Sequence, residues 1–380
     1  MARRRFHSKN RALTFRRVGL LLLGAALLAL IVWGISALVR EKDSFGTVAE
    51  LPFVSDAPYV FTGTGFYYIA GDSLVYYDLS DPEEGGKTMK LGTTEVFMRA
   101  SSAQMALYSG NSVQILGVSE AIDAGGTVLG IRCGATHTAV MRQDASGAAA
   151  VLVYDAKGTL IDAIEQDAEL LVDCGLRETS SGDVLWTLML DSSGSVPVNT
   201  ITTYTYEVDG AGTPRASMSG VMTVQGQLVE RVVFTQKSIF VAGTSHLIRC
   251  DAGVSGEAYR LLTYGYRLAD VTGAGTTPLF VYVERGAAEP YTRVKLYSAA
   301  EGDVAEATAR EVNLPEGAKG FVAANGRLYV FTEDTMYAYG ADGALQTSYA
   351  LGFACDRAVK LDEKRVLVES GGAMRLVTLK

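Results

Sequence analysis

Histidine and cysteine are scarce in this chain, with three histidines and four cysteines among 380 residues. A zinc site needs three or four clustered ligands, and His137 and His246 cannot supply them because His7 lies in a separate N-terminal segment. No G-x-S-x-G elbow is present to support a Ser-His-Asp triad. The four cysteines, Cys133, Cys174, Cys250 and Cys355, lie far apart without a C-x-x-C pair. We expect lone buried thiols, although disulfides are possible outside the cytoplasm.

Charge is missing altogether from the apolar run Val18–Val39. As a helix it would span roughly 33 Å, enough to cross a bilayer. Seven basic and no acidic residues precede it, so the positive-inside rule keeps the N-terminus in the cytoplasm. A cleaved signal peptide is the alternative, but its apolar stretch is usually shorter and Ile35-Ser36-Ala37 is a poor cleavage site. The sequence predicts a single-pass cell-membrane protein.

This anchor divides the chain into four predicted regions. They are a basic cytoplasmic tail (residues 1–17), a transmembrane helix (18–39), a tether (40–46) and an extracytoplasmic domain (47–380). The first 40 residues hold eight of the 34 basic residues and none of the 42 acidic ones, which leaves the rest near −16. A nucleic-acid binder normally carries the opposite charge. We therefore expect no nucleic-acid partner.

Helical periodicity is also missing, whereas one strand-turn-strand pattern recurs. Two apolar, alternating strands flank a Gly, Asp or Ser turn, which is typical of a β-hairpin. The eight instances are Phe66–Asp78, Met105–Leu116, Thr138–Asp155, Val184–Glu207, Ser238–Asp251, Leu279–Ser298, Arg327–Gly340 and Arg365–Leu379. Their turns lie 37 to 49 residues apart. One hairpin about every 40 residues predicts the four-stranded blades of a β-propeller.

Short stretches before most hairpins fit inner strands, and turns such as that in Tyr154–Ile164 lead into outer strands. The eighth unit ends after its third strand, so we expect Thr47–Phe53 to complete it and close the ring. The predicted fold is all-β, an eight-bladed propeller after one N-terminal transmembrane helix. Seven blades are the nearest alternative because the fourth unit is long, and two stacked β-sandwiches are a weaker one.

Two stretches, YDAKGTLIDAI (Tyr154–Ile164) and GRLYVFTEDTMYAYGADGALQTSYAL (Gly326–Leu351), resemble the repeats of quinoprotein-type propellers. That superfamily includes quinone-dependent dehydrogenases and outer-membrane assembly scaffolds. The chain lacks the adjacent cysteine pair of the enzymes and the tryptophan near each blade end, so the resemblance implies the fold without a quinone; we expect no cofactor. As a whole the chain also resembles an uncharacterised bacterial family of membrane-anchored proteins, which implies no activity.

Other candidate sites favour plain structure. The acidic turns Asp144–Gly147, Asp191–Gly194 and Asp270–Gly275 lack the full oxygen-ligand pattern of a calcium loop. The Tyr264–Tyr266 stretch suggests packing between blades more than a sugar platform. We expect no metal site and no catalytic residue.

Basic residues recur at or near the predicted inner strands, which line the central channel of a propeller. They are Arg99, Arg132, Arg231, Arg267, Lys319 and Arg357. Converging guanidinium groups bind carboxylate or phosphate, so the pattern predicts an anion site with at least four of the six at one channel mouth. The alternative is that they pair with Asp173, Glu230, Asp270 and Asp356 and fill the channel wall.

Together these features favour a non-enzymatic, membrane-tethered propeller that binds a partner protein or an anionic cell-envelope polymer. The alternative is a cell-envelope enzyme that acts on a polysaccharide at the channel mouth. A sensor is a weaker hypothesis, because the short cytoplasmic tail could act only through a partner. Fold by itself does not decide among these functions.

Overall fold

The computed structural model describes most of the chain after the predicted tether. The described residues are 46, 48–82, 86–93, 95–166, 169–208, 213–236, 238–251, 257, 259–273, 278–298 and 309–379. Within them, no helix has the length and hydropathy of a membrane span. The predicted transmembrane helix, Val18–Val39, lies outside the described residues.

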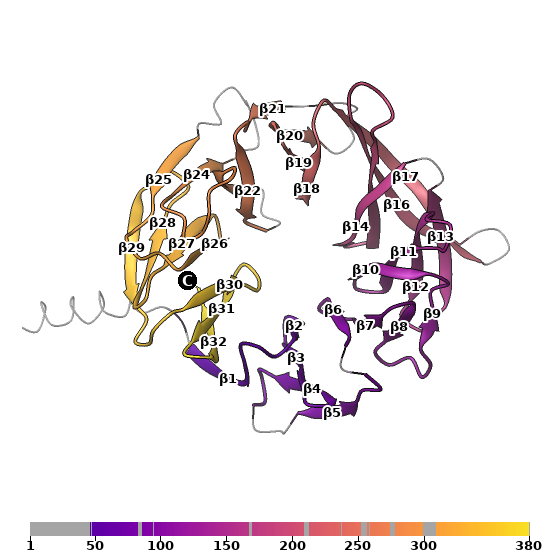
Figure 1. Ribbon diagram of the computed structural model, residues 1–380, viewed down its shortest axis with the longest axis horizontal. Helices are drawn as coiled ribbons and strands as arrows, with labels where there is room; N and C mark the ends of the chain where they lie inside the picture. Colours follow the sequence, from indigo (N-terminus) through magenta and orange to yellow (C-terminus); the bar gives the residue numbers. More distant parts are fainter. Residues whose placement is uncertain are drawn as a thin grey trace, which may run out of the picture.

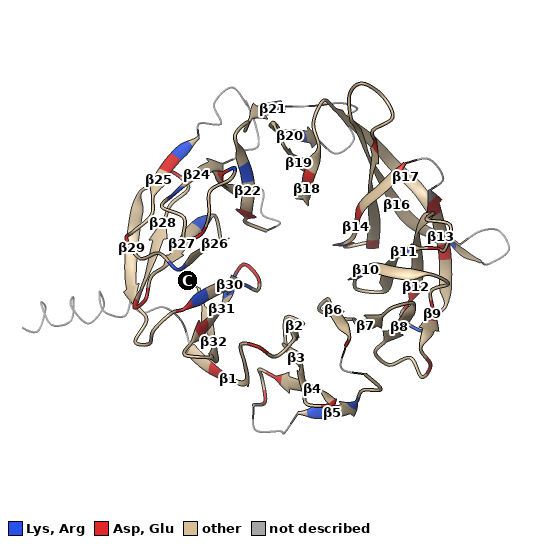
Figure 2. Cartoon of the chain, viewed as in Figure 1, with Lys and Arg blue, Asp and Glu red and all other residues tan. Residues whose placement is uncertain are grey.

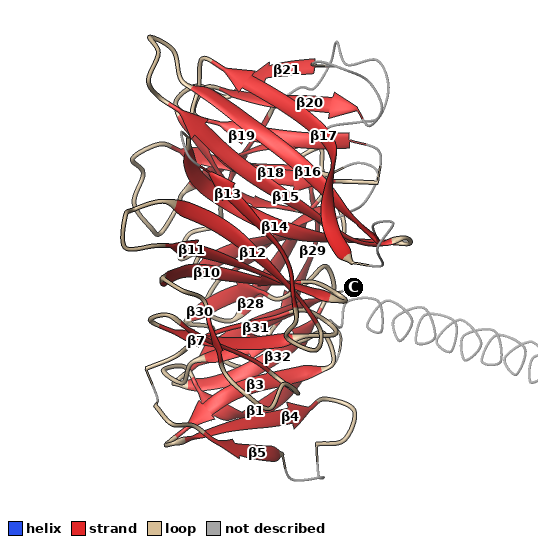
Figure 3. Cartoon of the chain, turned by 90° about the vertical axis from the view of Figure 1, so that its right-hand side faces the viewer, coloured by secondary structure: helices blue, strands red, loops and turns tan. Residues whose placement is uncertain are grey.

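In the described residues, thirty-two strands form eight four-stranded sheets arranged in a ring (Figure 1). Each sheet is a blade of antiparallel strands, and in seven of the eight the strands pair in sequence order with the first strand innermost. In the side view, every described element is a strand or a loop (Figure 3). The chain is therefore an all-β, eight-bladed propeller, as the hairpin spacing predicts, rather than a seven-bladed one or a pair of sandwiches.

The blades follow one another along the chain. The strands of blades 1 and 2 are β2 (Tyr59–Phe61), β3 (Gly65–Ala70), β4 (Ser73–Asp78), β5 (Lys87–Lys90), β6 (Phe97–Ala100), β7 (Met105–Ser109), β8 (Ser112–Ile115) and β9 (Ile122–Asp123). Those of blades 3 and 4 are β10 (Thr127–Cys133), β11 (His137–Gln143), β12 (Ala149–Asp155), β13 (Leu160–Gln166), β14 (Leu170–Thr179), β15 (Gly182–Asp191), β16 (Val198–Val208) and β17 (Pro214–Gln225).

The second half of the ring repeats this plan. The strands of blades 5 and 6 are β18 (Val229–Phe234), β19 (Ser238–Gly243), β20 (His246–Asp251), β21 (Tyr259–Leu262), β22 (Tyr266–Val271), β23 (Leu279–Glu284), β24 (Arg293–Ser298) and β25 (Arg310–Asn313). Those of blades 7 and 8 are β26 (Gly320–Ala324), β27 (Arg327–Phe331), β28 (Thr335–Tyr339), β29 (Leu345–Ala350), β30 (Arg357–Lys360), β31 (Arg365–Ser370), β32 (Ala373–Thr378) and β1 (Val48–Val54).

The first strand of the chain closes the ring. β1 pairs antiparallel with β32, as the outer strand of blade 8. This pairing joins the two ends of the described chain in one sheet and confirms the closure predicted from Thr47–Phe53. Closing the ring in this way leaves no unpaired strand between the last blade and the first.

The hydrophobic core is divided among the gaps between blades. Eight clusters of buried apolar side chains each draw on two neighbouring blades, including one between blades 8 and 1. Second strands such as β23 and β27 are covered on both faces, which explains their nearly continuous apolar sequences. Burial between blades, rather than within one central core, stabilises the ring.

The two faces of the ring carry different loops. The upper face, as we call it, holds the turns between second and third strands, such as those at Gly71 and Gly371 with φ angles of 61° and 58°. It also holds each connection from an outer strand to the next inner strand. The lower face holds the turns between first and second strands. β1 begins at the lower face, where the Gly46 amide donates to the Thr378 carbonyl at 3.0 Å.

Candidate functional site

The six predicted basic residues all lie on or beside inner strands. Five are on β6, β10, β18, β22 and β30, and Lys319 directly precedes β26. They nevertheless lie at different heights along the ring. Arg99 and Arg132 lie two residues before turns of the lower face, whereas Arg267 and Lys319 lie at the upper ends of their strands.

The residues lie at different positions along their strands, and in β10 and β18 a shift in register precedes Arg132 and Arg231. The inner strands β10, β14, β18 and β22 each contain an irregularity in their pairing with the second strand, of the kind a β-bulge produces. One extra residue changes both the height and the side of every residue that follows. The residues of similar position in the sequence are therefore not equivalent in the ring.

Three of the six, Arg267, Lys319 and Arg357, line one pocket of about 410 Å³ on the upper face. We call it the cationic pocket. It lies between the inner strands of blades 6, 7 and 8, and Figure 2 shows basic residues on β22 and β30 beside the central axis. Three of the six therefore share one pocket instead of the predicted four or more, because Arg99 and Arg132 lie near the lower face and Arg231 lies on β18, outside the pocket.

Cations outnumber carboxylates in the cationic pocket. Its lining includes Lys360 besides the three predicted residues, against two acidic residues, Asp270 and Glu289. The carboxylate of Asp270 accepts hydrogen bonds from the amides of Val271 at 2.8 Å and Ala323 at 2.7 Å. Among the described residues, Arg267, Lys319 and Arg357 form no ion pair. Three cations that form no ion pair therefore share the pocket with two carboxylates.

An aromatic residue holds the first of these cations. The Arg267 guanidinium donates a hydrogen bond to the Tyr291 hydroxyl, and its central carbon lies 5.8 Å from the Tyr291 ring centroid. Tyr291 packs in turn against Phe321, with ring centroids 5.9 Å apart. Because this contact uses no carboxylate, the charge of Arg267 stays available to a ligand.

Lys360 is not among the six predicted residues, and its contacts give it a structural role. Its ammonium group contacts the Glu363 carboxylate at 2.7 Å and donates to the carbonyl oxygens of Val271 and Ala323. Glu363 also accepts hydrogen bonds from the amides of Gly273 and Asn325. This pair ties blades 6, 7 and 8 together at the lower side of the pocket. Its only sequence signal is a second basic residue three positions after Arg357.

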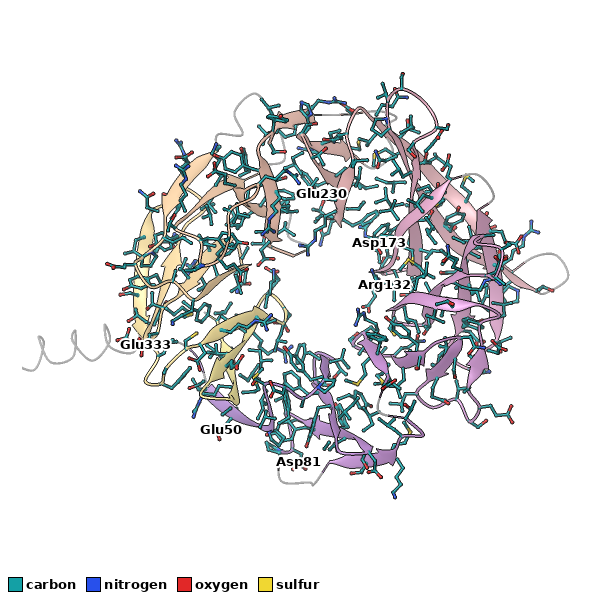
Figure 4. The ribbon with its side chains drawn as sticks, viewed as in Figure 1. Glu50, Asp81, Arg132, Asp173, Glu230 and Glu333 are labelled. Carbon is teal, nitrogen blue, oxygen red and sulfur yellow. The ribbon has the colours of Figure 1, made fainter. Side chains whose placement is uncertain are left out.

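The alternative of ion pairs in the channel wall holds for one of the six residues. Arg132 and Asp173 form a salt bridge of 2.7 Å between blades 3 and 4, beside the central axis (Figure 4). Glu230 pairs with Arg285 at 2.7 Å instead of with Arg231. Asp356 accepts a hydrogen bond from the Gly371 amide. Arg99 and Arg231 are exposed, and each lies apart from the cationic pocket.

A buried carboxylate at the lower face links blades 3 and 4. Asp183 accepts hydrogen bonds from the backbone amides of Ala135, Thr136 and His137 at 2.8 to 2.9 Å, and from the imidazole of His137 at 3.3 Å. Burial raises the pKa of Asp183, but these hydrogen bonds outweigh it and hold the pKa well below its usual range. His137 also stacks on Tyr206, with centroids 3.9 Å apart. The cluster fastens two blades together.

The remaining candidate residues have local roles. Asp144 and Asp191 accept hydrogen bonds from Ser146 and Ser193 in their own turns, and these bonds lower the pKa of both carboxyl groups. No cluster of three or more His, Cys, Asp or Glu residues that could bind a metal occurs in the described part of the chain. The packing predicted for Tyr264–Tyr266 is wrong for Tyr264, which is 77% exposed.

The four cysteines form no disulfide, as predicted. Three of them are buried, and Cys133 is partly exposed. Burial raises the pKa of Cys133, Cys174 and Cys355 to about 12 in each case. A thiol with such a pKa is protonated at neutral pH and therefore a poor nucleophile.

Comparison with known proteins supports the fold. No protein-family model matches the sequence, and no curated protein matches it significantly. The WD40 domain of SCAP from fission yeast is similar in structure, with a TM-score of 0.56, 10% identity and coverage of 88% of this chain and 94% of that chain. The AfRom2 CNH domain has a TM-score of 0.47 at 8% identity, covering 89% and 99% of the two chains. BamB from Moraxella catarrhalis has a TM-score of 0.36 at 11% identity, covering 89% and 98%.

At such low identity, the similarity to the SCAP domain supports the propeller architecture and nothing about ligands. The resemblance to the quinoprotein type and to the bacterial membrane-anchored family stays a prediction. The structure establishes that this chain has a β-propeller fold, with eight blades closed by its own first strand.

Proposed function

We propose that this chain is a membrane-tethered, extracytoplasmic propeller that binds an anionic group in the cationic pocket, without catalysing a reaction. The group would belong to a partner protein or to a cell-envelope polymer. The observation that carries the proposal is the set of three cations, Arg267, Lys319 and Arg357, that share a pocket of about 410 Å³ without a carboxylate partner. A volume of this order accommodates a small ligand or the end of a larger one.

The cationic pocket favours binding over catalysis, because its lining does not offer two free carboxyl groups. A polysaccharide-cleaving enzyme of the usual kind needs two carboxyl groups free to exchange a proton or attack the sugar. Both oxygens of Asp270 accept backbone hydrogen bonds, which commits this residue to the pocket wall. Glu289 is the other acidic residue of the lining, and it lies on an exposed turn. One free carboxylate does not make such a pair.

The test measures binding of three defined polymers to the full chain in detergent micelles by isothermal titration calorimetry. Polyglutamate supplies carboxylates, polyphosphate supplies phosphates, and dextran is the neutral control. We expect one or both anionic polymers to bind. Arg357→Gln and Lys319→Gln should each weaken that binding by about tenfold or more, because each removes a charged hydrogen-bond donor.

Lys157→Gln is the matched control, because Lys157 is an exposed lysine on a turn of blade 3, away from the cationic pocket. Its substitution should leave the affinity unchanged. Equal affinities in wild type, pocket variants and control would contradict the proposal, since they would show attraction to charge in general. A preference for polyglutamate or polyphosphate would identify which anionic group the pocket selects.

A further inference from the structure

Exposed apolar side chains lie on the same face as the cationic pocket, on the opposite part of the ring. They share a position in the upper half of an inner strand, or directly before it, in blades 2 to 5. We call them the apolar arc, and they are Phe97, Leu129, Leu170, Val172 and Leu228.

Their exposure is high for residues of this kind. Phe97 is 62% exposed, Leu170 63% and Leu129 50%. Three of the strands that carry them are neighbours, since β6 contacts β10 and β10 contacts β14. Scattered exposed leucines need no explanation, but a group of them on one face marks an interaction surface.

The upper ends of these strands place the arc on the same face as the cationic pocket rather than on the far face. The Leu228 carbonyl accepts a hydrogen bond from Thr244, which lies in an upper turn. Phe97 and Leu170 begin their strands, and a strand that runs from the upper to the lower face begins at the upper one. The pocket lies on the same face because Glu289, Pro290 and Tyr291 belong to the upper turn of blade 6.

We propose that the upper face is a docking surface for an extended acidic peptide segment of a partner protein. Apolar side chains of that segment cover the apolar arc, and one or more carboxylates enter the cationic pocket. The inference rests on the proposed function, which it deepens by naming the chemistry of the partner. The cationic pocket favours a peptide segment with negative charge, and the apolar arc favours a segment with apolar side chains.

Other occupants fit this face less well. A small free anion would occupy the pocket and leave the arc in water. A polysaccharide is recognised through aromatic platforms and hydrogen bonds, whereas four of the five arc residues are aliphatic. Glu230 lies between the apolar arc and the cationic pocket. Its ion pair with Arg285 neutralises its charge, so Glu230 does not repel an acidic segment.

The test uses three fluorescein-labelled dodecapeptides and the full chain in detergent micelles. One peptide combines Leu and Phe with Glu, one combines them with Lys, and one combines Ser with Glu. Fluorescence anisotropy should show the tightest binding for the apolar acidic peptide. The double variant Leu170→Ser with Val172→Ser should weaken that binding by about tenfold or more, because it removes two apolar contacts.

A matched control replaces two exposed valines outside the arc, Val208→Ser with Val221→Ser on the outer strands of blade 4, which are 67% and 56% exposed. This control should bind as the wild type does. Leu228→Ser alone serves as a second arc variant, and thermal melting by circular dichroism verifies that every variant is folded.

The outcomes separate this inference from the proposed function. If the polar acidic peptide binds as tightly as the apolar acidic one, or arc variants bind as the wild type does, the docking surface is refuted while the pocket stands. If Arg357→Gln has no effect on the apolar acidic peptide, the pocket fails and the proposal with it. Binding of phosphatidylglycerol vesicles through the arc, without peptide binding, would also overturn the inference in favour of a membrane surface.

Discussion

At the scale of single residues, blades are fastened to each other by polar side chains that bind backbone amides of a neighbouring blade. Asp183 is one of them, with a side chain that is 0% exposed in its contact with His137. Gln227, in the connection from blade 4 to blade 5, bonds in a similar way, because its side-chain oxygen accepts from the amides of Ser245 and His246 in blade 5. Such a group is costly to bury alone and stabilising once its hydrogen bonds are complete.

Replacing this carboxylate should weaken the protein in a pH-dependent way. Asp183→Asn should lower the free energy of unfolding at pH 7 by about 2–4 kcal/mol, since several charge-assisted hydrogen bonds are lost. The pKa of Asp183 is lowered from its ordinary value of 3.8, so its contribution is complete above that value and declines as the pH falls below it. Urea denaturation at pH 7 and pH 3 should therefore show a smaller deficit at pH 3.

Asp191→Asn is the control, because Asp191 bonds only within its own exposed turn. Its stability should stay close to that of the wild type. An Asp183→Asn deficit of the same size at both pH values would show that shape, rather than charge, gives Asp183 its role.

The sequence predicts part of the candidate site at this scale. It identifies Arg267, Lys319 and Arg357 because inner strands come before recognisable hairpins. It wrongly groups Arg99 and Arg132 with them, because the sequence does not fix where each short inner strand begins and ends, and these two residues lie near the lower ends of β6 and β10. Lys360 was missed because its role depends on carbonyl groups of two other blades.

At the scale of elements, the short strand β1 holds two blades together. Phe53, on its buried side, lies 5.3 Å from the Tyr59 ring, 5.1 Å from Tyr68 and 5.4 Å from Phe66, measured between centroids. These rings belong to blade 1, so β1 joins blade 8 by hydrogen bonds and blade 1 by packing.

Truncating this side chain should therefore open the ring at one seam. Phe53→Ala should lower the free energy of unfolding by about 3–5 kcal/mol through lost burial and a residual cavity. Val54→Ala is the matched control on the same strand, since Val54 is 59% exposed, and should change stability by less than about 0.5 kcal/mol. Denaturant titrations followed by tyrosine fluorescence would measure both. Similar losses for the two variants would contradict a sealing role for Phe53.

All eight hairpins could be predicted from the sequence, since their strands are apolar and their turns carry Gly, Asp or Ser. The inner strands are harder, because several are three or four residues long and half exposed, such as β2 and β30. Strand β17 was also difficult to predict from the sequence. It is long and largely exposed, and little in its sequence marks an outer strand.

At the scale of the whole molecule, the ring can be argued from hairpin periodicity, whereas the membrane anchor is a prediction from residues outside the described chain. Removing residues 1–39 should move the protein from the membrane pellet to the soluble fraction after ultracentrifugation, because the only uncharged run of bilayer length is lost. Removing residues 2–10 alone, as a control, should leave it in the pellet. A full chain that is soluble and shortened near residue 37 would indicate a cleaved signal peptide instead.

The direction in which the chain enters the ring has a further consequence. Gly46 meets the propeller beside Thr378, at the rim of the lower face, while Arg357 and its companions open on the opposite side. If the anchor lies just before Gly46, the lower face points toward the membrane and the upper face points away from it. Partners would then approach from beyond the protein, and the lipid headgroups would have no direct access to the binding side.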